Sequence, residues 1–211
     1  GLMKKFLSKM PVMIVFLSLA VIGLVFYIVM LARPVSYGMT YTWNHVVTEA
    51  DASIFGQEVG SEINYSLKIL NDRKMEQSII QEDNGEPIEI WIIRNGNKFI
   101  MIPEGVSSEE EYDDMLEALK ADKNEWDALW SGEGEGMPVF NVNAFNINVN
   151  IEGVEMEFVC TGAIVFASIF AVVEVALITF AVLATVFYIK NRKSTNENIS
   201  NSDNNINLES N

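Results

Sequence analysis

The sequence contains very little of the chemistry that enzymes use. It has one cysteine, Cys160, and one histidine, His45, more than a hundred residues apart. A nucleophilic cysteine and its histidine base must lie in contact. The sequence also has no phosphate-binding loop, dinucleotide-binding motif, zinc-protease motif or serine-hydrolase motif. We therefore expect a non-enzymatic protein that needs neither a metal nor a cofactor.

A single cysteine excludes an internal disulfide. A domain outside the cytoplasm must then be held together by its core alone, which is more typical of a bacterial envelope than of a eukaryotic secretory pathway. Cys160 itself has three interpretations: a small buried residue, an intermolecular thiol at the outer membrane surface, or an acylated residue if the topology is inverted.

Charge is nearly absent from two long segments, residues 10–32 and residues 161–189. A helix needs roughly 20 apolar residues to cross a bilayer, so both segments are predicted to be transmembrane helices. A cleaved signal peptide is the alternative for the first segment. However, a signal peptide has an apolar region of only about 7–15 residues and a small-residue cleavage site, and neither fits the sequence that leads to Arg33 and Pro34.

Basic residues precede the first apolar segment and follow the second. They are Lys4, Lys5 and Lys9 before the first segment, and Lys190, Arg192 and Lys193 after the second. Because basic residues favour the cytoplasmic side, we expect a multi-pass plasma-membrane protein with both termini cytoplasmic. Residues 1–9 form the cytoplasmic N-terminus, residues 34–160 lie outside, and residues 190–211, rich in Asn and Ser, form a disordered cytoplasmic tail.

Positive charge is scarce in residues 34–160, where seven basic residues face 25 acidic ones, giving 7 − 25 = −18. Such a charge disfavours nucleic acid and would attract a basic extracytoplasmic partner. The acidic cluster between Glu109 and Glu117 lacks the alternating ligand spacing of a calcium loop. We interpret this cluster as a solvated helix face whose first turn complements the helix dipole.

Turn signals and period-two alternation predict strands in residues 34–160. Asn95-Gly96 predicts a type I′ turn between two apolar strands. Asn71-Asp72 would join residues 62–70 to 73–80, Glu152-Gly153 would join two alternating segments between residues 145 and 158, and residues 35–43 add a strand. About seven strands result, in a mostly antiparallel sheet.

One amphipathic helix interrupts the strands. Ser108 and Glu111 form a capping box, and residues 131–138, rich in glycine, end the helix. Apolar residues recur at helical spacing: Tyr112, Met115, Leu116, Leu119, Trp126, Leu129 and Trp130. We expect this stripe to lie across the sheet and supply much of its core. The predicted fold class is thus an α+β membrane protein, with two transmembrane helices flanking an extracytoplasmic sheet domain.

Glu174 is the one carboxylate inside an apolar segment. It lies about 18 Å from Gly162 and about 22 Å from Ile189 at ~1.5 Å per residue, too deep to reach water. At ~100° per residue it shares a face of the helix with small residues that allow close helix packing. The residues within that arc are Ala163, Ala167, Ala171, Ile178, Ala181 and Thr185. On the first helix, Ser18 is one candidate partner, and Ala20, Gly23 and Tyr27 form a second compatible face.

Three roles for Glu174 remain open: a protonated staple between the two helices or within a homodimer, a contact with a cation of another membrane protein, and a proton or ion relay. The leading functional hypothesis is an accessory or interaction subunit of an envelope complex. It would contact a second copy or another membrane protein through the second helix. The alternative is a sensor whose outer domain binds a small ligand or peptide and signals through the helix pair.

Overall fold

The computed structural model describes residues 1–79, 86–102, 105–131 and 137–209, with side chains through Ile199. Its helices are α1 (Leu2–Leu7), α2 (Met10–Leu31), α3 (Ala52–Phe55), α4 (Glu109–Ala121), α5 (Lys123–Leu129) and α6 (Thr161–Glu209). Its strands are β1 (Thr40–Val46), β2 (Glu62–Ile69), β3 (Lys74–Ile79), β4 (Ile88–Asn95), β5 (Lys98–Ile102), β6 (Phe140–Val142), β7 (Asn146–Ile151) and β8 (Val154–Val159).

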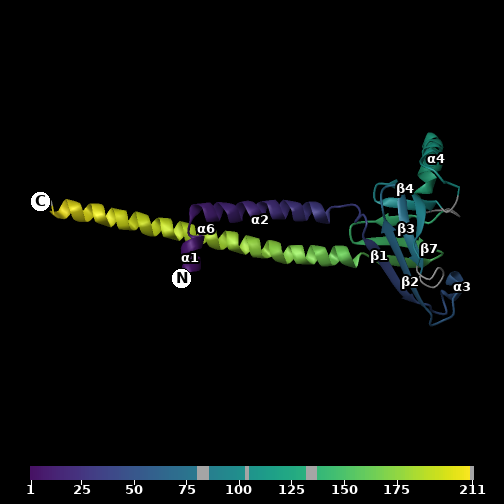
Figure 1. Cartoon of the computed structure of the whole chain (residues 1–211), viewed down its shortest axis with the longest axis horizontal. Helices are drawn as coiled ribbons and strands as arrows, with labels where there is room; N and C mark the ends of the chain where they lie inside the picture. Colours follow the sequence, from purple (N-terminus) through teal and green to yellow (C-terminus); the bar gives the residue numbers. More distant parts are fainter. Residues whose placement is uncertain (80–85, 103–104, 132–136, 210–211) are drawn as a thin grey trace. The chain divides into compact units, whose positions relative to one another are not determined.

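The chain divides into two compact units. Residues 32–166 form the barrel unit, and residues 1–31 with 167–211 form the helix-pair unit. In the barrel unit the strands follow one another in sequence order, β1 to β8, and close into a barrel in which every described pairing is antiparallel (Figure 1). The prediction of mostly antiparallel strands is confirmed, but the strands form a closed barrel of eight instead of a sheet of about seven. β1 meets β8 through the pair Thr42 and Val159, which removes both free edges.

Alternating side chains from all eight strands fill the barrel interior. The fully buried ones include Tyr41, Leu67, Ile69, Met75, Ile92, Phe99, Ile147 and Phe158. Phe99 stacks on Phe140 with ring centroids 4.7 Å apart, and Phe158 meets Tyr65 edge-on at 5.0 Å. An interior of eight strands is just wide enough to be filled by side chains or to hold one small ligand, and here side chains occupy it.

The first strand begins five residues later than its predicted start. Val35 and Ser36 are buried outside the strand, and Ser36 Oγ donates a hydrogen bond to the carbonyl of Ala144 at 2.7 Å. Tyr41 Oη in turn donates to the carbonyl of Asn143 at 2.8 Å. Gly38 has φ +71°, a left-handed conformation that breaks an extended strand. The segment before Thr40 is thus a corner tied to the turn between β6 and β7.

The two short hairpins have different turn types, and the first differs from its prediction. Asn95 pairs with Lys98, so the loop between β4 and β5 is Gly96-Asn97, with positive φ at the glycine. Glycine at the first central position is the type II′ pattern rather than the predicted type I′. In the loop between β7 and β8, Glu152 and Gly153 both have positive φ, 51° and 88°. That hairpin, predicted at this dipeptide, is the one with the type I′ signature.

The predicted amphipathic helix is divided in two at Asp122, whose carboxylate accepts hydrogen bonds from the backbone N–H groups of Asn124 and Glu125 and so starts α5. The described side chains of α4 and α5 lie outside the main barrel core, contrary to expectation. They cover the outside of β4 and β5, where Ile93, Ile100 and Ile102 form a separate cluster with Tyr112. Residues 132–136 of the predicted break lie outside the described residues.

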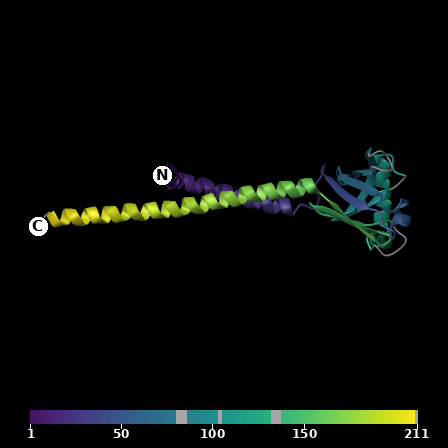
Figure 2. The ribbon, with the colours of Figure 1, turned by 90° about the horizontal axis from the view of Figure 1, so that it is seen from below.

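In the helix-pair unit, α2 and α6 pack together along one seam. Phe16 stacks on Phe180 with centroids 5.6 Å apart, and Phe170 lies 5.3 Å from Phe26 and 5.9 Å from Tyr27. Both helices are long and apolar enough to span a membrane. α6 continues as one helix beyond Ile189 to Glu209 (Figures 1 and 2), with the side chains from Asn191 to Ile199 exposed. The predicted disorder of residues 190–211 stays a prediction.

Candidate functional site

Glu174 lies in the seam of the helix pair, with only 3% of the residue exposed. It faces Gly23 so closely that a Cβ atom at Gly23 would clash with its Oε2. Among the described residues, neither carboxylate oxygen has a hydrogen-bond partner. Buried carboxyl groups are normally hydrogen-bonded or paired, so this pair of unsatisfied oxygens is the most unusual polar feature of the helices.

Small side chains line the same seam on α6. Ala167, Ala181 and Ala184 are buried, and Ala171 is half-buried. On α2 the facing residues recur at intervals of three and four: Phe16, Ala20, Gly23, Tyr27 and Met30. This is the second of the two faces that the sequence offered. Ile178 is exposed, because the seam passes through Leu177 on that turn.

The structure does not bring the other sequence-predicted candidates to Glu174. Ser18 is exposed on α2, away from the seam. Ala163 is buried in the core of the barrel unit instead of the helix pair. Cys160 is fully buried in the same core and its backbone N–H donates to the carbonyl of Phe145 at 2.7 Å. The interpretation of Cys160 as a small buried residue therefore agrees with its position.

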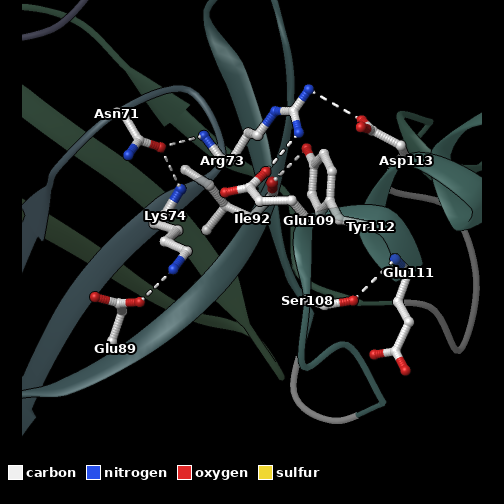
Figure 3. A network of polar contacts seen from close by, with 10 residues as sticks. All are labelled: Asn71, Arg73, Lys74, Glu89, Ile92, Ser108, Glu109, Glu111, Tyr112 and Asp113. Atoms are coloured by element: carbon white, nitrogen blue, oxygen red, sulfur yellow. Dashed lines mark hydrogen bonds and ion pairs between the residues drawn. The ribbon is translucent and has the colours of Figure 1, made fainter.

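A polar network on the barrel ties the start of α4 to the turn between β2 and β3 (Figure 3). Arg73 contacts Glu109 at 2.6 Å and Asp113 at 3.0 Å, and its guanidinium lies 4.9 Å from the ring centroid of Tyr112. The hydrogen bond to Glu109, together with the charge of Asp113, raises the pKa of Arg73 above its usual value. The Tyr112 hydroxyl donates to the carbonyl of Ile92 at 2.9 Å, and burial raises the pKa of Tyr112.

Arg94 lies beside this network in a shallow hollow of about 480 Å³, lined by Tyr37, Asp72, Arg73 and Tyr112 among others. Its guanidinium donates to Tyr37 Oη, to Asp72 and to the carbonyl of Gly96. Among the described residues its Nε is buried without a partner. Burial, reinforced by the neighbouring Asp72 and opposed by Arg94, raises the pKa of Tyr37.

The single histidine is held by aromatic rings and one carboxylate. His45 stacks on Trp43 with centroids 4.8 Å apart, and its Nε2 lies 2.6 Å from Oδ2 of Asp51. The backbone N–H of Thr48 donates to the other Asp51 oxygen at 2.6 Å. Burial acts to raise the pKa of Asp51, but the hydrogen bonds from Thr48 and His45 outweigh it and leave that pKa lowered. Sequence reasoning did not find this pair, because spacing alone did not show that the loop turns back.

No nucleophile accompanies the His45–Asp51 pair among the hydrogen bonds of the described residues. Nor do three or more His, Cys, Asp or Glu residues gather in metal-binding geometry within the described part of the chain. No family model, curated protein or solved structure matches the chain. The geometry of its own residues is therefore the whole basis for a functional proposal.

Proposed function

We propose that the chain is a non-enzymatic, two-helix membrane protein that acts as an accessory or interaction subunit of an envelope complex. α2 and α6 cross the plasma membrane, both termini are cytoplasmic, and the barrel lies outside. The observation that carries this proposal is that side chains such as Tyr41 and Phe158 fill the barrel interior. A barrel whose lumen is occupied by its own side chains works through its outer surface, and that surface is strongly acidic.

The position of Glu174 supports the staple among its three candidate roles. A carboxyl group enclosed between α2 and α6 and seated against Gly23 is not presented to a cation on another protein. In the neutral form it still has one donor and one acceptor, which suits a close approach to the α2 backbone where glycine leaves it open. The outward faces of α6 remain for a second copy or for another membrane protein.

Affinity purification of the full chain in mild detergent tests the interaction, with three exposed acidic residues of α4 changed to lysine. The variant is Glu110→Lys with Asp114→Lys and Glu117→Lys. The matched control makes the same charge change elsewhere on the barrel unit, with Glu49→Lys, Glu58→Lys and Glu155→Lys; all six positions are exposed. We expect a co-purifying envelope protein that is lost from the α4 variant and at high salt, because surface attraction is screened. Absence of any co-purifying membrane protein or second copy would contradict the proposal.

The topology has its own test. A cysteine introduced at Asn95, in the exposed hairpin between β4 and β5, should react with an impermeant thiol reagent added to intact cells. A cysteine at Asn191 should react only after permeabilisation. Cys160 provides no background, because its thiol is buried. The reverse pattern of labelling would invert the proposed topology.

Glu174→Gln and Glu174→Leu separate the three roles of the carboxyl group. A staple predicts a mild effect of glutamine and a modest loss with leucine, since hydrogen bonds between membrane helices average about 0.6 kcal/mol. A contact with a partner's cation predicts that both variants lose the partner, which is left with an unpaired charge. A relay predicts normal assembly of both variants and loss of a pH-dependent activity.

The sensor alternative is favoured by one observation, the hollow that Arg94 lines together with Tyr37 and Tyr112. A guanidinium at the wall of a hollow suits a carboxylate, such as that of a short peptide. Titration of acetylated peptides into the full chain, followed by the amide resonance of Gly96, tests it. Saturable shifts that disappear with Arg94→Gln would favour the sensor, and no shift would favour the interaction subunit.

A further inference from the structure

We propose that the hollow between α1 and the cytoplasmic part of α6 binds the phosphate group of an anionic phospholipid. The hollow measures about 390 Å³ and lies within the helix-pair unit. Its lining includes Lys4, Lys5 and Ser8 from the N-terminal segment, and Phe187, Lys190 and Asn191 from α6. Two segments far apart in sequence thus bring three ammonium groups to one concave surface.

The charges in this hollow are unbalanced. No acidic residue lines it, and within the described part of the chain Lys4, Lys5 and Lys190 form no ion pair; the ion pairs found there all belong to the barrel unit. Lys4 Nζ lies 5.8 Å from the ring centroid of Phe187. The Phe187 ring also gives the hollow an apolar wall, which suits the glycerol and upper acyl region of a lipid beside its phosphate.

Local structure holds the lysines in place. α1 ends at Leu7 and is capped by Ser8, whose backbone N–H donates to the carbonyl of Lys4 at 3.2 Å and whose hydroxyl donates to the carbonyl of Lys5 at 3.1 Å. Leu7 is only 2% exposed, so it anchors α1 to the helix pair. The remaining apolar side chains of α1, Leu2, Met3 and Phe6, are exposed beside the lysines. This combination is typical of a segment that lies in a membrane interface.

The position of the hollow, next to the ends of the two apolar segments, indicates a lipid rather than free phosphate. Lys190 directly follows Ile189, the last residue of the apolar segment of α6, and α1 precedes the first residue of α2, Met10. If the helices span the bilayer as proposed above, the three lysines lie at the level of the headgroups. Each Lys near an anionic leaflet contributes about fivefold in affinity. The proposed lipid site rests on that membrane placement, and the test below distinguishes failure of the lipid site from failure of the membrane placement.

The test reconstitutes the full chain into nanodiscs of phosphatidylcholine and phosphatidylglycerol in equal amounts. Native mass spectrometry then measures the ratio of the two lipids that stay bound. The hollow variant is Lys4→Gln with Lys190→Gln. The matched control is Lys9→Gln with Lys193→Gln, which removes the same charge from the same end of the unit but not from the lining of the hollow.

We expect wild type to retain phosphatidylglycerol preferentially, the hollow variant to lose about 25-fold of that preference at fivefold per lysine, and the control to lose much less. An equal loss in both variants would reduce the site to diffuse attraction by basic residues and overturn the proposal. Displacement of the lipid by millimolar inorganic phosphate would assign the hollow to free phosphate and overturn it too. A chain that inserts stably but shows no preference refutes the lipid site alone, whereas a chain that does not insert refutes the proposed membrane placement.

Discussion

The barrel and the helix pair bury their side chains in opposite ways. The barrel encloses large aromatic and branched residues from eight strands, many of them without any exposed surface. The helix pair buries mainly small residues along one seam. In the most apolar stretch of each helix, only 6% of α2 and 17% of α6 is buried. The first arrangement covers most of its large apolar side chains within its own core, whereas the second leaves most of its apolar side chains exposed.

The comparison also separates two kinds of polar burial. In the barrel unit the buried carboxylate, Asp51, is bonded to Thr48 and His45. In the helix pair the buried carboxyl group, Glu174, has no partner among the described residues. A water-exposed domain can supply backbone and side-chain donors from loops, but a seam of two apolar helices offers few. Among the described residues, Glu174 is therefore a buried carboxyl group whose hydrogen-bonding capacity the two helices do not satisfy.

Phe158→Ala should produce the largest effect, because the ring is fully buried inside the barrel. We expect a loss of about 3–5 kcal/mol in the free energy of unfolding, the range for aromatic truncation in a core. Trp126→Ala is the comparison, since Trp126 belongs to α5, is only half-buried and packs in the cluster outside the barrel interior. Its loss should be about 1–2 kcal/mol. Denaturant unfolding of the full chain in detergent, followed by near-ultraviolet circular dichroism, measures both; equal losses would place the helices in the main core after all.

Gly23→Ala tests the seam of the helix pair. The new methyl group would clash with the Glu174 carboxyl, and overpacking typically costs about 1–3 kcal/mol. Glu174→Ala in the same chain should recover much of that loss, because it removes the group that clashes. Ser18→Ala, on an exposed position of the same helix, serves as the control. Thermal stability in detergent is the measurement, and an additive double variant would show that the two residues do not meet.

Ser108→Ala should have a smaller effect, confined to α4. The Ser108 hydroxyl accepts a hydrogen bond from the Glu111 N–H at 3.2 Å, and the Glu111 carboxylate accepts two from Ser107 at 2.7 Å. Loss of an N-cap typically costs about 1 kcal/mol. Hydrogen exchange of the α4 amides should quicken while the amides of β1 and β2 do not. A uniform change across the barrel would show that α4 and the barrel unfold as one.

The smallest expected effect is a change in how the melting temperature of the barrel falls at acid pH; we call this low-pH part of the curve its acid limb. The pKa of Asp51 is lowered from its ordinary value of 3.8, so its contribution is present above that value and is lost as the pH falls through the lower folded-state pKa. Asp51→Asn should flatten this part of the pH dependence of the melting temperature. An unchanged acid limb in the variant would show that other carboxylates set it.

Much of the barrel could be read from the sequence, because period-two alternation marks which face of a strand is buried. The hairpin at Glu152-Gly153 and the start of β2 at Glu62 were predicted correctly. Closure was not predicted, because it depends on the pairing of β1 with β8, which lie far apart in the sequence and meet with Thr42 opposite Val159. A signal for the position of α4 was present but missed. β4 and β5 are apolar on both faces, which indicates a strand covered on both sides.

For the helix pair, the sequence by itself determined the two apolar segments, the depth of Glu174 and the alanine-lined face around it, because helical periodicity and residue size are local properties. Which α2 residue meets Glu174 was decided only by the tertiary structure. Ser18 and Gly23 lie on different faces of the same helix, and the rotation of α2 depends on how all the ridges of both helices pack. The packing selected Gly23 because the absence of a Cβ atom leaves room for the carboxyl group.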